Sequence, residues 1–171
     1  AERNEVTMQI EGHNNDFDFS SWVPANYDPS FPAEWDQTPY YNQRVWGSNN
    51  DLDVNIDGNN NMTAQIVGNS DATVHASDGN DADIVIDGSY NHAYQGILGD
   101  NNITKMNIDG SYNGAFNEMI GDGNESYINV DGNLNEACVS QFGGSNWSKV
   151  TQDGNSNVAK VKQTGNDYYN N

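Results

Sequence analysis

Residues 80–101 read NDADIVIDGSYNHAYQGILGDN, and the next 22 residues, 102–123, read NITKMNIDGSYNGAFNEMIGDG. The same pattern returns in residues 124–145, NESYINVDGNLNEACVSQFGGS, and in residues 146–166, NWSKVTQDGNSNVAKVKQTGN. Each copy opens with asparagine and then carries a glycine, an asparagine and an alanine at fixed positions. A constant 22-residue step is typical of proteins that stack one structural unit on the next.

Within each copy, apolar and polar residues alternate in two short runs. In the copy that begins at Asn80, Ile84 and Ile86 mark the first run, and Ala93 and Ile97 mark the second. Period-two alternation of this length is typical of a strand with one buried face. The runs are joined by D-G-S-Y-N or a similar sequence, in which glycine and asparagine accept the positive φ of tight turns. Each copy is therefore predicted to form strand, arc, strand and arc, and no segment carries a helical pattern.

A single unit of this kind cannot bury its inner faces, whereas stacked copies can, because each strand pairs with its equivalent about 4.8 Å away. We therefore predict one all-β domain over residues 1–171. It is expected to be a two-sheet β-solenoid of about six strand–arc–strand repeats, stacked in register and cross-β when polymerised. The 22-residue repeats begin near residues 4, 50, 80, 102, 124 and 146.

In-register stacking places shared residues above one another, so their side chains are predicted to form hydrogen-bonded ladders, as amides do in cross-β structures. The glycine positions let the backbone turn where no Cβ fits. The predicted ladder residues are Asn50, Asn80, Asn102, Asn124, Asn146, Gly58, Gly88, Gly110, Gly132, Gly154, Asn61, Asn91, Asn113, Asn135, Asn157, Gln141, Gln152 and Gln163.

The first two copies carry extra residues. The insertion in the first copy covers about residues 17–40 and contains all four prolines and several aromatic residues. The second strand of that copy reads either as Tyr41–Val45 or as Phe17–Phe19, and the sequence leaves both open. Because proline cannot donate to a strand ladder, the insertion is predicted to leave the arc, as a loop on the solenoid flank or as an aromatic surface at an end or subunit contact. In the second copy, residues 68–79 are predicted to form a bulged arc.

An acidic residue precedes the arc glycine in every copy, on the outward face of the first strand. This acidic column consists of Glu11, Asp57, Asp87, Asp109, Asp131 and Asp153. At about 5 Å and an effective dielectric of 20, each neighbouring pair repels by roughly 3 kcal/mol, and by less once solvent screens the charges. The column reads either as a solvated stripe that binds arc amides or as a ladder that loads Ca²⁺ or another hard cation through its oxygens. In both cases salt or divalent ions should favour assembly.

Composition excludes several function classes. A net charge of −19 disfavours nucleic acid as a partner. There is no transmembrane run and no signal segment at Ala1, so a secreted protein would be present in its mature form. The three histidines occupy unrelated repeat positions, and nothing places a base beside a nucleophile, so neither a zinc site nor an enzyme is expected. Cys138 is alone and therefore reads as an incidental thiol or an intermolecular crosslink.

Charge is unevenly distributed between the two ends of the chain. Lys149, Lys160 and Lys162 fall in the last copy, whereas Glu5 and Asp51 belong to an acidic early part. Head-to-tail stacking would set basic ends against acidic ends, although exposed ion pairs contribute little each.

With the register fixed, the copies resemble the curlin repeat of curli subunits, the secreted bacterial proteins that build biofilm amyloid. That repeat is roughly S-x-ψ-x-ψ-x-Q-x-G-x-x-N-x-A-x-x-x-Q, in which ψ is aliphatic. The last copy matches it best, at Asn146, Val150, Gln152, Gly154, Asn157, Ala159 and Gln163. The chain departs from it in three respects: asparagine replaces the opening serine, aliphatic residues fill most glutamine slots, and the proline-rich insertion has no counterpart.

The resemblance implies a structural subunit of an extracellular functional-amyloid fibre at the cell surface, with a role in biofilm matrix and adhesion. The implied partners are further copies of the chain, joined head to tail through their end strands, together with a nucleator subunit and secretion machinery. The alternative is a monomeric β-solenoid binding module, such as an ice-, glycan- or calcium-binding adhesin domain. A parallel β-helix enzyme that acts on polysaccharide is a third reading.

Overall fold

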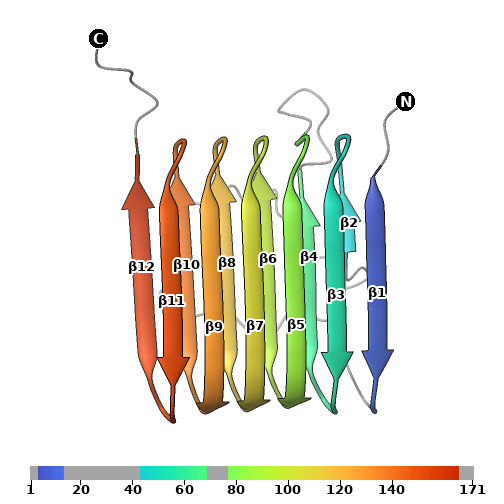
Figure 1. The fold of residues 1–171 in the computed structure, drawn as a ribbon, viewed down its shortest axis with the longest axis vertical. Coiled ribbons are helices and arrows are strands. Elements are labelled where there is room, and N and C mark those ends of the chain that lie inside the picture. Colours follow the sequence, from blue (N-terminus) through green and yellow to red (C-terminus); the bar gives the residue numbers. More distant parts are fainter. Residues whose placement is uncertain (1–3, 14–42, 69–76, 166–171) are drawn as a thin grey trace.

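The computed structural model of the chain describes residues 4–13, 43–68 and 77–165. These residues form strands joined by arcs, without a helix (Figure 1), so none of them lies in a helix that could cross a membrane. The strands of this part of the chain are β1 (Glu5–Glu11), β2 (Gln43–Val45), β3 (Asp51–Asp57), β4 (Met62–Val67), β5 (Asp81–Ser89), β6 (His92–Leu98), β7 (Ile103–Ser111), β8 (Gly114–Ile120), β9 (Glu125–Asn133), β10 (Glu136–Phe142), β11 (Trp147–Asp153) and β12 (Val158–Thr164). The prediction of an all-β fold is confirmed.

The strands form two parallel sheets that face each other (Figure 1). The first sheet has the order β1-β3-β5-β7-β9-β11, and the second has the order β12-β10-β8-β6-β4-β2. The chain crosses to the other sheet at every arc, so strands that neighbour each other within a sheet are next but one in sequence. We call a strand of the first sheet, together with the strand that follows it in the second sheet, a rung.

Neighbouring strands pair in register, so residues at equivalent positions of successive copies lie side by side. Asp81 of β5 pairs with Ile103 of β7, and Glu125 of β9 pairs with Trp147 of β11, so each step is 22 residues. The extra residues of the first two copies do not disturb this register, because Asp51 pairs with Asp81 across a step of 30. The insertions are therefore accommodated in the arcs, while the strands keep their alignment.

The second strand of the first copy is β2, because Gln43–Val45 pairs with Gln65–Val67 of β4. Of the two alignments that the sequence left open, this supports the one that uses Tyr41–Val45. The residues of the other alignment and the whole insertion at about residues 17–40 lie outside the described residues. Of the bulged arc at 68–79, only Gly68 and residues 77–79 are described.

The core lies between the sheets and is built from the inward residues of the alternating pattern. Ile84, Ile86, Met106 and Ile108 are almost completely buried, and Ala93 of the facing sheet packs against them in one cluster. Burial of each large aliphatic side chain contributes about 1.5 to 3 kcal/mol. The small alanines let the sheets approach, so a thin core suffices to hold them together.

The arcs depend on residues that adopt positive φ. Gly110 has a φ of 120°, and a Cβ at this position would lie 1.9 Å from the carbonyl oxygen of Gly132 in the next rung. No side chain fits there, because real Cβ atoms essentially never approach backbone oxygen within 3.0 Å. Tyr90 and Tyr112, two residues after their arc glycines, also have positive φ, and their rings stack with a centroid separation of 4.8 Å.

Candidate assembly surfaces

The two ends of the stack present edge strands. At one end lie β1 and β2, which we call the head surface, and at the other lie β11 and β12, which we call the tail surface. Each edge strand pairs with a described strand on one side only (Figure 1). The backbone N–H and C=O groups of such an edge form a template on which another strand can pair.

The head surface exposes apolar side chains that would be buried anywhere else in the stack. Val6, Met8 and Ile10 of β1 are 49 %, 38 % and 37 % exposed. Their partners in β3, which occupy the same inward slots, are almost completely buried. The inner face of β1 therefore gains burial if another rung stacks on it.

The tail surface continues the columns of the interior. In β11, the inward residues Ser148, Val150 and Gln152 are buried, while Ala159 and Val161 of β12 are partly buried against the core. The inward residues of the last rung thus continue the inner face of the rungs beneath it.

An asparagine ladder runs along each arc. Within each ladder, the backbone N–H of one asparagine donates to Oδ1 of the asparagine in the preceding rung, as Asn102 does to Asn80 at 2.9 Å and Asn135 does to Asn113 at 2.9 Å. Asn61 accepts the backbone N–H of Asn91 in this way, and the other nine predicted asparagines all donate in this way. The two ladders consist of Asn50, Asn80, Asn102, Asn124 and Asn146 on one arc and Asn61, Asn91, Asn113, Asn135 and Asn157 on the other. All but the last member of each ladder are buried.

The last asparagine of the second ladder behaves differently from those below it. In the interior, Nδ2 of Asn113 donates to the carbonyl of Gly132 at 2.8 Å, and Nδ2 of Asn135 donates to that of Gly154 at 2.8 Å. Asn157 instead donates to the carbonyl of Asp153, within its own turn, at 3.2 Å. The interior bond reaches an arc glycine of the following rung, and the equivalent glycine for Asn157 would be Gly12 of a second copy.

Glutamines also link the rungs and the sheets. Gln141 donates to Oε1 of Gln163 at 2.8 Å, and Gln152 donates to the carbonyl of Glu136 in the facing sheet at 2.9 Å. The sequence interpretation did not select Gln65 and Gln95, although both are buried and Gln65 donates to Oε1 of Gln95 at 2.9 Å. The signal that could have identified them is the amide in the same inward slot of successive copies.

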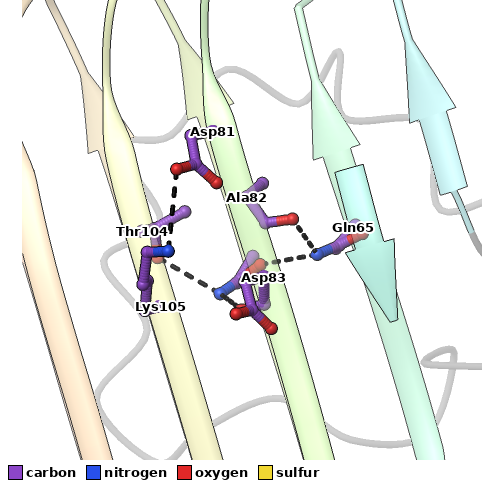
Figure 2. A network of polar contacts seen from close by, with 7 residues as sticks. Gln65, Asp81, Ala82, Asp83, Thr104 and Lys105 are labelled. Atoms are coloured by element: carbon purple, nitrogen blue, oxygen red, sulfur yellow. Dashed lines mark hydrogen bonds and ion pairs between the residues drawn. The ribbon is translucent and has the colours of Figure 1, made fainter. Parts of the chain in front are cut away.

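Gln65 reaches across to the first sheet (Figure 2). Its Nε2 donates to the carbonyls of Ala82 at 3.0 Å and Asp53 at 2.8 Å, and that of Gln95 donates to Thr104 Oγ1 at 3.2 Å. These bonds tie the two sheets together through buried amides. Buried amide groups need such partners, because an unpaired one costs about 1 to 3 kcal/mol.

The predicted acidic column lies on the outer face of the first sheet, in register. Glu11 pairs with Asp57, Asp87 with Asp109, and Asp131 with Asp153, and all six carboxylates are exposed. Within the described ranges, no group of three or more His, Cys, Asp or Glu side chains is arranged to hold a metal ion. Cation binding by the column therefore stays a prediction.

A second acidic group lies at the start of the first-sheet strands (Figure 2). Nζ of Lys105 is 3.7 Å from Oδ2 of Asp81. Desolvation raises the pKa of Asp83, with Lys105 opposing the shift and the neighbouring carboxylates adding to it. Partial desolvation, followed by repulsion from Asp53 and other carboxylates, raises the pKa of Asp51 in the same way. Charge repulsion is thus concentrated towards the head end of the stack.

Three of the five Lys and Arg residues in the described ranges lie at the tail surface, whereas Arg44 lies on β2 at the head and Lys105 on β7. Lys149 lies on β11, and Lys160 and Lys162 lie on β12, all on outward faces. Lys160 approaches Glu136 to 3.6 Å, and Lys162 Nζ lies 5.6 Å from the ring centroid of Phe142. The tail is therefore the more positive of the two end surfaces, and the head carries Glu5 and Glu11 on its edge strand.

Comparison with known protein families identifies a match for part of the chain. A family model described as the curlin associated repeat matches residues 132–165, the part of the chain that contains β10, β11 and β12. The resemblance to the curlin repeat is thereby confirmed for this segment. No curated protein and no solved structure matches the chain.

Proposed function

We propose that this chain is a structural subunit of an extracellular, curli-like amyloid fibre, in which copies add head to tail. The observation that carries the proposal is that the in-register columns run to both ends of the stack and stop at edge strands. Support also comes from the curlin repeat at residues 132–165. On this proposal the whole chain is a β-solenoid of about six 22-residue repeats, and polymerisation continues the same cross-β stacking.

The proposed junction repeats the step between interior rungs. Extending the register of β9 and β11 places β1 of the next copy beside β11, with Trp147 opposite Glu5 and Asp153 opposite Glu11. Val150 then lies above Met8, so an apolar side chain that is partly exposed in one copy becomes buried. Two different surfaces meet, and such a heterologous contact forms a filament when its geometry does not close into a ring.

The wider role follows from the family resemblance. The fibre is proposed to lie outside the cell, at its surface, and to act mechanically in adhesion and biofilm matrix. A nucleator subunit and secretion machinery are its proposed partners besides further copies of the chain. A net charge of −19 speaks against binding to nucleic acid.

Electron microscopy of the purified chain, combined with thioflavin fluorescence and fibre diffraction, tests the proposal. The expected result is an unbranched filament one stack wide that binds thioflavin and diffracts at about 4.8 Å along its axis. A chain that stays monomeric and folded under conditions that screen its charge would refute it.

A monomeric β-solenoid binding module is the second candidate. It is favoured by the row of exposed side chains on one arc, in which Tyr90, Tyr112 and Leu134 follow one another. In this candidate the acidic column would serve a calcium- or glycan-binding adhesin domain. Binding of a glycan or Ca²⁺ by a stable monomer, with no filaments, would favour it over the fibre subunit.

A further inference from the structure

The outer faces of the two sheets differ in chemistry. On the first sheet, the outward slots are mainly Asp, Asn and Lys and are largely exposed, as in β3, where Asp51, Asp53 and Asn55 point to solvent. On the second sheet, the outward slots are largely apolar. They are occupied in β4, β6 and β8 by Met62, Ala64, Ile66, His92, Tyr94, Gly96, Leu98, Gly114, Phe116, Glu118 and Ile120.

The outer face of the second sheet is also buried in its central part. Phe116 is 7 % exposed, Ala64 is 7 % exposed and Glu118 is 3 % exposed, although all three point away from the core by the alternation of their strands. The ring of Phe116 stacks on that of Tyr94 with a centroid separation of 4.9 Å. No described strand lies over this face (Figure 1), so the two sheets themselves do not account for the burial.

We propose that this face is a docking surface for the chain's own segment 14–42. The segment follows His13, the last described residue after β1, and leads to Gln43 in the edge strand of the second sheet. Burial on the face is greatest over β4, β6 and β8, the strands nearest that entry point, and it is lost at β12, where Val158 is 63 % exposed. This gradient indicates an occupant that comes from the head end.

Reach separates this segment from segment 69–76, the other internal part of the chain outside the described ranges. Segment 69–76 has eight residues, which at about 3.3 Å per residue allow an excursion of about 13 Å out and back. Phe116 lies five residues from Gly121 at the corresponding arc, or about 16 Å along the strand, and two strands beyond β4. Segment 14–42 has 29 residues and can span the three strand spacings of about 4.8 Å from β2 to β8 and return.

The composition of the segment suits this face. It contains eight aromatic residues, among them Trp22, Phe31 and Trp35, and its four prolines remove backbone donors that a flat apolar surface could not satisfy. It also has five acidic and no basic residues, and the exposed edge of the face carries Lys160 and Lys162. Glu118 opposes this charge match, so apolar contact is the main source of the docking energy.

If the proposed fibre forms, docking of this segment leaves the filament with polar flanks, because it removes an apolar strip that would repeat along the axis. Filaments without the segment should then associate side by side through their second sheets. This consequence depends on the proposed function, whereas docking within one chain does not.

Thiol labelling tests the docking directly. In a Cys138→Ser background, Ala64→Cys places the only thiol on the buried face, and Asn55→Cys places it on the open face of the first sheet in the same rung. We expect maleimide to label Cys at position 64 at least tenfold more slowly than at position 55, since reaction requires exposure of the sulfur. Deletion of residues 17–40 should bring the two rates together by accelerating position 64 alone.

A variant of unchanged length controls for misfolding of the deletion variant. The triple substitution Trp22→Ser, Phe31→Ser and Trp35→Ser should likewise accelerate labelling at position 64 several-fold and leave position 55 unchanged. Equal acceleration at both positions, or none at position 64 in either variant, would overturn the proposal. Labelling does not require filaments, so a chain that protects position 64 but never polymerises would refute the proposed function alone.

Discussion

Replacing Gly154 by alanine should block growth of the filament at one end while leaving the subunit folded. Inside the stack, a Cβ on Gly132 would lie 1.9 Å from the carbonyl oxygen of Gly154. Gly154 belongs to the last rung, and a Cβ there meets only Nδ2 of Asn157, at 3.8 Å. In the proposed junction, the carbonyl of Gly12 from the next copy takes the place that Gly154 takes above Gly132.

The size of the effect follows from this geometry. To restore a contact of 3.0 Å, the next copy must withdraw by about 1.1 Å (3.0 − 1.9) at this arc. Three of the bonds at the equivalent interior junction are Gly154 N–H to Asp131 O, Ser156 N–H to Asn133 O and Asn135 Nδ2 to Gly154 O, at 2.8 to 3.0 Å. Such a withdrawal breaks them, and at about 1 kcal/mol each the loss is about 3 kcal/mol. The affinity of the filament end for the next copy should therefore fall by about a hundredfold.

The folded subunit should lose less. The φ of Gly154 is 101°, so alanine there carries a backbone strain of about 1 to 3 kcal/mol without a steric clash. Gly110→Ala meets the Gly132 carbonyl within the same chain and should prevent correct stacking of the subunit. Gly123→Ala is the matched control, because Gly123 also has a positive φ, 66°, but its Cβ would lie 3.8 Å from the nearest atom, Ser145 Oγ.

Seeded elongation measures the difference. A Gly154→Ala chain keeps its head surface, so it should add to wild-type ends and then stop them, and a small fraction of it should arrest wild-type growth followed by thioflavin. Circular dichroism should show the β content of wild type in both Gly154→Ala and Gly123→Ala. If Gly154→Ala elongates as fast as Gly123→Ala and does not arrest wild-type growth, the next copy does not stack on the last arc. The head-to-tail reasoning is then wrong.

Asn113→Ala should destabilise the fold by about 3 to 5 kcal/mol in denaturant unfolding, because it leaves the Asn135 N–H and the Gly132 carbonyl without their partner; Asn107→Ala, whose exposed amide bonds only to Asn129, should cost below about 1 kcal/mol. The raised pKa values of Asp51 and Asp83 mean that the native state binds more protons than the unfolded state, so stability should increase as the pH falls through them towards about 4. Burial lowers the pKa of His92, which has the opposite effect: its contribution is lost as the pH falls below about 6.5, and His92→Gln should remove that part of the unfolding profile. Salt should accelerate assembly by screening the acidic column, and Ca²⁺ should exceed NaCl of equal ionic strength only if the column binds it.

Much of the fold could be predicted from the sequence, because stacking places residues that are one repeat apart in sequence side by side on neighbouring strands. Once Asn80 and Asn102 are aligned, every inward and outward position follows from strand alternation, and Ile86 and Ile108 are buried as that alternation requires. The ladders follow from the same alignment. Insertions do not spoil the prediction, because extra residues in an arc leave the strand register of Asp51 with Asp81 unchanged.

Other features depend on distances that the alignment does not contain. The bonds of Gln65 to carbonyls of the facing sheet require the separation of the sheets, which is set by packing of the whole core. The burial of Phe116 could not be predicted, because alternation places it outward and treats outward positions as solvated. Asn157 has a different partner from Asn135 because it lies in the last rung. The repeat pattern does not predict this difference, because both positions are asparagine.

The distribution of charge favours one of the possible end contacts of the proposed fibre. Two head surfaces in contact would bring Glu5 and Glu11 of one copy near those of the other, and two tails would do the same with their lysines. Either closed dimer would also run its edge strands antiparallel, which takes the asparagine and glycine columns out of register. A head on a tail sets Lys149 beside the acidic strand and keeps every column continuous. Only this contact repeats without closing, so the charge asymmetry of one chain favours a polar filament over a dimer.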